Sequence, residues 1–337
     1  FIIAMLVFGI TSLFVGISSS VSIFILFRIF QGFSAGVITS LMFTLLVKTA
    51  GQDHIGRVMA IVSTPMIFGP ILGPTLGGFI IHFASWRWMF FINIVVSLIS
   101  VPLMMKYVPS FKPFEKHKKL DIWGILLLCI TSATVIYGIS LAGTIGSFID
   151  SKVMTFIFIG VAAIVAYIFY NKLCDFNTVL PLNLFKNKTY SASMTGLLLA
   201  NVGIMGPMVI LPLYFQEFKG YSAIGAALAL IPQGIGMLIT RPYIGTSIDR
   251  IGSKKVIYIS IVIAILGTIP LIFVDNESSI AWLSFILFIR GCSVGGINLG
   301  LMADAYKGVS QNQLSEAGVG INMIENIGAS FGTAIIA

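Results

Sequence analysis

Three charged residues lie inside apolar segments of the chain, where a charge is costly and usually functional: Glu325, Arg28 and Arg290. Glu325 stands about nine residues into the last apolar segment, which is roughly 12 Å at the rise of an α-helix. The other acidic residues are expected in loops or at helix ends. Because burial favours the neutral carboxyl, a group at this depth can take up and release a proton. We therefore expect Glu325 to bind a proton and a cationic or polar group of a substrate in competition.

The two arginines allow other interpretations. Arg290 lies about ten residues into the preceding segment, at a depth similar to that of Glu325. A buried Glu325–Arg290 ion pair, which would hold the carboxylate charged, is therefore the alternative to a proton site. Arg28 lies about six residues from the outer end of its segment, so its side chain could simply extend to the outer headgroups. The sequence leaves these alternatives open.

A run rich in glycine and proline, residues 69–78, is the most distinctive element that must position such groups. Gly69, Gly73 and Gly77 recur every fourth residue, so they share one helix face and allow another backbone to approach closely. Prolines are tolerated within such a helix in a bilayer because neighbouring helices re-satisfy the freed carbonyls. The run predicts a bent, closely packed membrane helix.

The composition excludes a soluble protein. Of the 337 residues, 57% are hydrophobic and only 9% are charged, whereas soluble domains carry about 25% charged residues. The net charge of +8 comes from basic residues in short loops, so nucleic acid is not an expected partner. The three cysteines are far apart and H-E-x-x-H is absent, so neither a disulfide framework nor a metal site is expected, and we expect no cofactor.

The fold class expected is an all-α polytopic membrane protein. A span needs about 20 apolar residues, and no basic region or cleavage site marks the first segment as a signal peptide. The predicted spans lie near residues 1–18, 22–47, 58–82, 88–108, 121–142, 152–171, 190–216, 223–244, 255–274, 280–303 and 317–337.

The basic residues of the connections predict the orientation. Lysines and arginines on one side outnumber those on the other by fourteen to three, and the long connection 107–120 holds four of them. Basic loops stay in the cytoplasm. The prediction places Phe1 on the cytoplasmic side.

Two segments repeat one another. Phe24 to Arg28 leads to Gly32-Phe33-Ser34-Ala35-Gly36, and Phe285 to Arg290 leads to Gly291-Cys292-Ser293-Val294-Gly295. Both segments run from the outside to the inside, so the repeat is parallel. Parallel repeats about an axis along the membrane normal are typical of the halves of major-facilitator transporters.

Four motifs, in order, resemble the fourteen-helix drug:proton antiporters of the major facilitator superfamily (EmrB/QacA type). Residues 69–78 resemble the antiporter signature G-x-x-x-G-P-x-x-G-G, and its matching positions are Gly69, Gly73, Pro74, Gly77 and Gly78. Residues 85–93 are similar to the segment that follows it. Arg28-x-x-Gln31-Gly32 resembles the motif of the fourth helix. Gly245, Asp249, Arg250 and Gly252 match the loop motif of the C-terminal half.

This resemblance implies a major-facilitator fold truncated at both ends, with eleven transmembrane helices, numbers 3–13 of fourteen. It divides the chain into the rest of the N-terminal half (1–108), a linker with two extra helices (109–189) and a C-terminal half without its last helix (190–337). It implies a role in proton transfer for Arg28 and a role in substrate recognition or coupling for Glu325. Asp249 and Arg250 would stabilise one gating state.

Several polar residues are candidates for lining a substrate cavity, and each could instead be a packing hydrogen bond within the bundle. They are Gln31, Asn201, Gln233, Asn298, Asn322 and Asn326.

The function implied is proton-coupled efflux of drugs or amphipathic cations by alternating access, in a multi-pass protein of the bacterial cell membrane that confers antibiotic resistance. We expect a monomer whose partners are a small-molecule substrate, protons and the lipid bilayer, and an accessory envelope partner stays open. The alternatives are a dedicated exporter of one metabolite or antibiotic and, from other classes, a membrane sensor or a lipid-modifying enzyme. The chain has no Walker pattern for ATP and no interfacial cluster of Asp or His for an enzyme.

Overall fold

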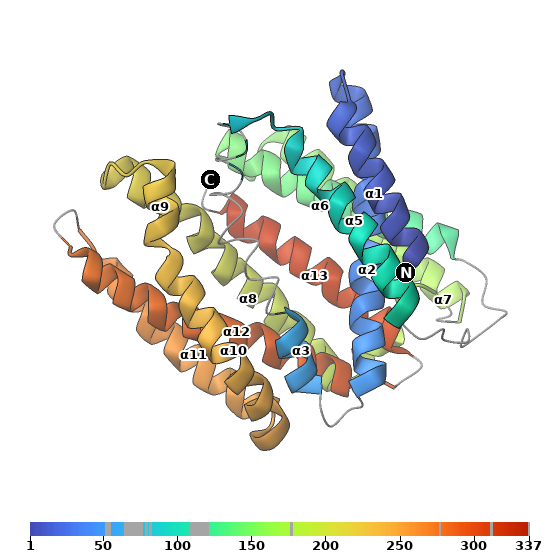
Figure 1. Ribbon diagram of the computed structural model, residues 1–337. Coiled ribbons are helices and arrows are strands. Elements are labelled where there is room, and N and C mark those ends of the chain that lie inside the picture. Colours follow the sequence, from blue (N-terminus) through green and yellow to red (C-terminus); the bar gives the residue numbers. More distant parts are fainter. Residues whose placement is uncertain are drawn as a thin grey trace. The chain divides into compact units, whose positions relative to one another are not determined.

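The computed structural model describes residues 1–50, 55–63, 77, 80, 83–107, 121–175, 178–275, 278–310 and 313–335. Within these ranges the chain is helical and contains no strand (Figure 1). Helices are the expected answer to a lipid environment, because each one satisfies its own backbone hydrogen bonds. The structure confirms the all-α fold class.

The helices coincide with the predicted spans, apart from 58–82, of which only part is described. Their bounds are α1 Ile2–Ile17, α2 Val21–Ala50, α3 Ile55–Ser63, α5 Trp88–Tyr107, α6 Ile122–Ile145, α7 Ser151–Leu173, α8 Lys188–Leu213, α9 Ala223–Ala229, α10 Ile231–Ile251, α11 Ser253–Thr268, α12 Ile280–Lys307 and α13 Leu314–Ala334. Eight helical stretches within the described residues are long and apolar enough to cross a membrane. The 16-residue α1 is shorter than these, and α13 is long enough but too polar.

The chain forms two compact units: unit 1 comprises residues 1–45 and 72–117, and unit 2 comprises residues 46–71 and 118–337. The predicted division at residues 108 and 189 follows the repeat rather than this clustering and stays a prediction. In unit 1, α1 packs against α5 through small residues. A Cβ at Gly9 would lie 2.8 Å from Ser97 Cβ, so glycine is what allows the two helices to come this close.

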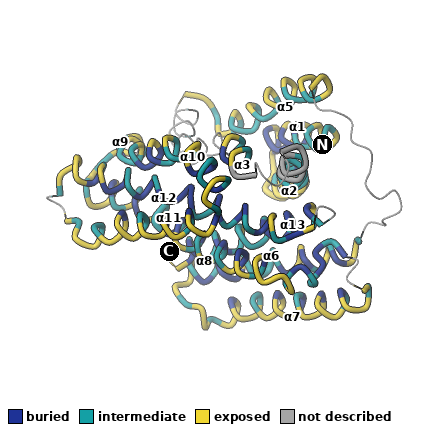
Figure 2. The backbone as a smooth tube through the Cα atoms, turned by 90° about the horizontal axis from the view of Figure 1, so that it is seen from below, coloured by how far each residue is buried: buried dark blue, intermediate teal, exposed yellow. Residues whose placement is uncertain are grey.

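The centre of unit 2 is α12. In Figure 2 buried residues gather along α12 and exposed ones along α7, and 50% of the most apolar stretch of α12 is buried against 22% for α7. Glycines bring the neighbouring helices close. A Cβ at Gly236 of α10 would overlap the Phe288 carbonyl oxygen, and one at Gly291 would overlap the Gln233 carbonyl oxygen. The α10–α12 crossing therefore has room for hydrogen atoms only.

Helices of unit 2 lose regular α geometry at one end of the bundle. After Pro207 and Pro212, α8 passes into a π-helical turn, Tyr214–Phe218. A break at Leu230 separates α9 from α10, and α11 ends in the 3₁₀ turn Ile269–Phe273. These are typical consequences of proline and of π-bulges in membrane helices. The end is held by an apolar cluster that includes Leu211, Phe215, Ala226, Leu283 and Leu287.

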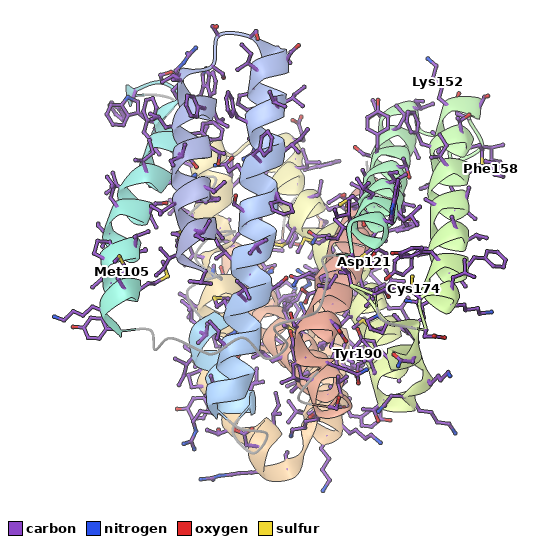
Figure 3. The ribbon with its side chains drawn as sticks, turned by 90° about the vertical axis from the view of Figure 1, so that its right-hand side faces the viewer. Met105, Asp121, Lys152, Phe158, Cys174 and Tyr190 are labelled. Atoms are coloured by element: carbon purple, nitrogen blue, oxygen red, sulfur yellow. The ribbon has the colours of Figure 1, made fainter. Side chains whose placement is uncertain are left out.

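A polar cluster holds α6 and α7 to the segment that follows them. Asp121 caps α6 through Gly124 N–H (2.8 Å), and its carboxylate also accepts hydrogen bonds from Tyr170 Oη (2.7 Å) and Val179 N–H (3.0 Å). Tyr167 Oη donates to the Leu180 carbonyl (2.9 Å). Figure 3 labels Asp121 and Cys174, which mark the ends of α6 and α7 that meet here. The cluster fixes the chain leading from α7 to the 3₁₀ turn Leu182–Lys186 and α8.

An Asp121→Ala substitution is expected to cost about 2–3 kcal/mol of stability, because it removes a charge-assisted acceptor from three donors at once. Asp150→Ala is the matched control. Asp150 is half-buried and caps α7 through Lys152 N–H, in a hydrogen bond that is exposed to solvent; loss of such a cap costs about 1 kcal/mol. Thermal unfolding of the purified full-length protein in detergent measures both. Equal losses in the two variants would show that the cluster adds nothing beyond helix capping.

Candidate functional site

The last helix, α13, presents a polar face that carries Glu325. On this face side chains bond to backbone carbonyls four residues earlier: Asn322 Nδ2 to Gly318 (2.9 Å), Asn326 Nδ2 to Asn322 (2.8 Å) and Ser330 Oγ to Asn326 (2.9 Å). The two asparagine bonds use amide N–H groups, so the Oδ1 atoms of both asparagines remain as acceptors. Asn322 and Glu325 are half-buried and Asn326 is exposed. A carboxyl group among amide oxygens suits a cation or a proton.

Another face of α13 packs against α8 and brings Asn201 toward Glu325. A Cβ at Gly328 would lie 2.7 Å from the Leu198 carbonyl oxygen and 3.1 Å from Asn201 Cβ. Asn201 is buried, and its Nδ2 donates to the Leu197 carbonyl (2.9 Å). Gly328 follows Glu325 by three residues, so Asn201 lies about one helical turn from Glu325 along α13. The α8–α13 contact thus lies beside the face of α13 that carries Glu325.

Arg290, a buried charge on α12 of unit 2, has an amide as its partner. Its side chain is 3% exposed, and Nη1 donates to Gln233 Oε1 of α10 at 3.2 Å. Between the described side chains, no ion pair joins Arg290 to Glu325, and Glu325 shows neither a hydrogen bond nor a salt bridge. The arrangement leaves the Glu325 carboxyl available for a ligand.

Arg28 in unit 1 begins a directed chain of hydrogen bonds. Its Nη1 donates to Gln31 Oε1 (2.8 Å), Gln31 Nε2 donates to Ser12 Oγ of α1, and Ser12 Oγ donates to the Phe8 carbonyl (2.7 Å). Gln31 and Ser12 are buried, and the Arg28 guanidinium lies 5.6 Å from the centre of the Phe90 ring. Sequence reasoning missed Ser12, because only the packing of α1 on α2 reveals its role. Arg28 and Arg290, which follow the two copies of the repeat, both donate Nη1 to a glutamine Oε1.

Of the loop motif in unit 2, Asp249 makes the informative contact. Its Oδ2 accepts a hydrogen bond at 3.0 Å from Arg57 N–H, in the first turn of α3. A carboxylate there also interacts favourably with the helix dipole. Gly252 reverses the chain between α10 and α11 with a φ of +88°, which favours glycine. Gly245 is buried within α10 and Arg250 is exposed at its end.

Asp249→Asn is expected to weaken the α10–α3 contact by about 1–2 kcal/mol, because it removes the charge but keeps the shape of the acceptor. The measurement is the rate at which a cysteine placed at position 57 reacts with a membrane-impermeant maleimide. The rate should rise when the contact opens more often. Lys254→Gln, an exposed change of charge in the same loop, is the control. A reaction rate unchanged in Asp249→Asn would show that the Asp249 carboxylate does not hold α3 against α10.

The remaining predicted residues are less informative. Gly69, Gly73, Pro74 and Gly78 of the antiporter signature lie outside the described residues, and Gly77 is helical, where an added Cβ would lie 3.9 Å from Met89 Sδ. Asn298 on α12 has a buried Oδ1 that finds no hydrogen-bond partner in the described part of the chain. The described residues also contain no cluster of His, Cys, Asp or Glu that could hold a metal ion.

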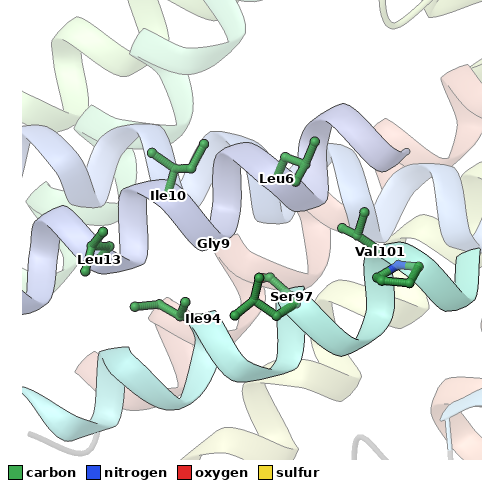
Figure 4. A pocket seen from close by; sticks show the side chains of 9 residues that line it. Leu6, Gly9, Ile10, Leu13, Ile94, Ser97 and Val101 are labelled. Atoms are coloured by element: carbon green, nitrogen blue, oxygen red, sulfur yellow. The ribbon is translucent and has the colours of Figure 1, made fainter. Parts of the chain in front are cut away.

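A groove of about 240 Å³ lies between α1 and α5 of unit 1 (Figure 4). Ser97 contributes a hydroxyl to a lining that is otherwise apolar and carries no charge, made by Leu6, Gly9, Ile10, Leu13, Ile94, Ser97, Leu98, Val101 and Pro102. A cationic ligand would find no counter-charge in this groove, so Glu325 remains the better candidate site.

The helices and the deep polar residues define a polytopic all-α membrane protein with charged groups inside its helix bundle. The family model of the Major Facilitator Superfamily matches residues 1–333. The chain belongs to this superfamily, as the motifs and the repeat predicted.

Similar proteins carry names of multidrug exporters. The chain is 29% identical to a multidrug resistance protein B homolog of Mycobacterium tuberculosis over 99% of its length and 62% of the relative's. It is 26% identical to the multidrug export protein EmrB of Escherichia coli, over 99% of its own length and 65% of the relative's. An uncharacterized MFS-type transporter of Bacillus subtilis, YhcA, is 28% identical over 100% of the chain and 63% of the relative. The chain spans less than two thirds of the length of each of these relatives.

Proposed function

We propose that the full-length protein exports drugs or other amphipathic, cationic compounds by alternating access, driven by proton entry. The observation that carries the proposal is the half-buried Glu325 carboxyl, which lies on the polar face of α13 with no ion pair to any described residue. The relatives named as multidrug export proteins support the same function. One charge crossing 100 mV supplies about 2.3 kcal/mol, which sustains a gradient of roughly fifty-fold.

In this proposal Glu325 binds either a proton or the cationic group of a substrate. A proton arriving from outside neutralises the carboxyl and releases the substrate, and loss of the proton to the cytoplasm restores the charge for the next substrate. Asn201, Asn322 and Asn326 supply amide oxygens for polar groups of the substrate. The Asp249 contact to α3 stabilises one of the two gating states. The protein resides in a bacterial cell membrane with Phe1 toward the cytoplasm and acts as a monomer, with an accessory envelope partner as an open possibility.

The test is ethidium efflux by cells that express the full-length protein and lack their own exporters. We expect energised efflux that a protonophore abolishes, together with proton release into the medium of everted vesicles on addition of substrate. Absence of efflux for every cation tested would contradict the proposal and favour a membrane sensor. Export of one compound class alone would favour a dedicated exporter, and a panel of cations with unlike shapes distinguishes the two.

A further inference from the structure

Tyr306 on α12 has a buried hydroxyl without a hydrogen bond. The residue is 1% exposed, and its Oη finds no hydrogen-bond partner in the parts of the chain that are described. An unpaired buried hydroxyl costs about 1–3 kcal/mol, which phenylalanine in the same place would avoid. A tyrosine at this position therefore needs a reason other than packing.

The Tyr306 hydroxyl lies against the beginning of α13. A Cβ at Gly318 would lie 3.0 Å from Tyr306 Oη, so the absence of a side chain at Gly318 leaves the hydroxyl its space. A second buried tyrosine, Tyr190 of α8, donates to the Ala317 carbonyl at 3.2 Å; its position is labelled in Figure 3. Two tyrosine hydroxyls from different helices thus meet the same turn of α13.

Polar groups continue from this turn to Glu325. The Gly318 carbonyl accepts the hydrogen bond from Asn322 Nδ2, and Asn322 precedes Glu325 by three residues on the same side of α13. From Gly318 to Glu325 the helix rises roughly 10 Å.

The beginning of α13 lies at an end of unit 2 that carries basic residues. Tyr306 is followed by Lys307, and the Asn187 side chain between Lys186 and Lys188 donates to the Gly308 carbonyl. Since basic ends face the cytoplasm, the track leads from Glu325 toward the inner membrane surface.

We propose that the Tyr306 hydroxyl relays the proton of Glu325 toward the cytoplasmic side of α12 and α13. The relay rests on the proposed function, because it supplies the inward step of the exchange. The hydroxyl oxygen accepts a proton that originates on the Glu325 carboxyl, directly or through water, and gives up its own proton on the far side. Tyrosine is left unchanged, the carboxylate is restored, and the proton ends on cytoplasmic water.

The test is Tyr306→Phe in the full-length protein, reconstituted in proteoliposomes. Two rates are measured: dye transport driven by an imposed proton gradient, and counterflow of dye against dye, which needs no net movement of protons. A lost relay group should slow proton-driven transport by about a hundredfold and leave dye affinity and counterflow unchanged. Because phenylalanine removes an unpaired hydroxyl, the variant should be at least as stable as the parent.

Tyr167→Phe is the matched control. Tyr167 is another fully buried tyrosine of unit 2, but its hydroxyl is paired with the linker segment, so its loss should lower stability and leave the ratio of the two rates unchanged. The relay would be overturned if the parent protein transports dye in response to a proton gradient and the ratio of proton-driven transport to counterflow is the same in Tyr306→Phe. Failure of the parent protein itself to respond to the gradient would instead count against the proposed function.

Discussion

Replacing Glu325 by glutamine in the full-length protein is expected to abolish proton-coupled export of cations while the protein still folds. Glutamine keeps the volume and the hydrogen-bonding oxygen of the side chain but cannot exchange a proton or attract a cation by charge. No ion pair to a described residue depends on the Glu325 carboxylate, so neutralising it leaves no buried partner charge behind. The effect should therefore fall on transport and not on the amount of folded protein.

The measurement combines ethidium efflux in cells with substrate-induced proton release from everted vesicles. Glu316→Gln is the matched control, since Glu316 lies in the first turn of the same helix, where a carboxylate contributes about 0.3–1 kcal/mol through the helix dipole. The control should export normally. If Glu325→Gln exported cations at the parental rate with the parental proton yield, the carboxyl would have no part in coupling.

The partner of Arg290 illustrates what hydropathy reading could and could not predict. Depth within an apolar segment was readable from position along the chain. Arg290 lies within α12, which is long and apolar enough to cross a membrane, and Glu325 lies within the more polar α13. The direction of each side chain around its helix depends on which helices pack where. Arg290 precedes Gly291, which lies against the backbone of α10 at Gln233, so its guanidinium reaches Gln233. Glu325 lies on α13, whose glycines pack against α8.

The interruptions of the helices could not be predicted from the sequence either. The apolar run from 190 to 216 predicted one span, and the structure continues it as a π turn over Tyr214–Phe218. Hydropathy is the same for α and π geometry, so only the fit to neighbouring side chains decides between them. Likewise Asp121 was readable as a residue at a helix end, whereas its bonds to Tyr170 and Val179 depend on how α7 and the residues near Val179 pack against the start of α6. The spans, the repeat and the family motifs follow from local pattern, and the polar pairings follow from packing.

The close approach of α10 and α12 leads to the second large expected effect: Gly291→Ala should strongly reduce the yield of folded protein. A Cβ at Gly291 would overlap the Gln233 carbonyl oxygen and lie 2.8 Å from its carbon. A side chain can relieve an overlap by changing its rotamer, but the backbone of Gln233 cannot, so α10 and α12 must move apart. Overpacking of this kind costs about 3 kcal/mol, and the separation would also stretch the neighbouring bond from Arg290 to Gln233.

Gly295→Ala is the internal control for this crossing, because Gly295 lies on the same helix about one turn further on. A Cβ there would have Ile244 Cδ1 as its nearest neighbour at 3.5 Å, an ordinary contact. Alanine also stabilises a helix interior by about 0.5–1 kcal/mol relative to glycine. The midpoint temperature of unfolding and the monodisperse fraction after detergent extraction should therefore fall in Gly291→Ala. In Gly295→Ala both quantities should stay the same or rise. Equal stability of the two variants would mean that α10 and α12 are further apart than their glycines indicate. Arg290 would then need a partner other than Gln233 to remain buried.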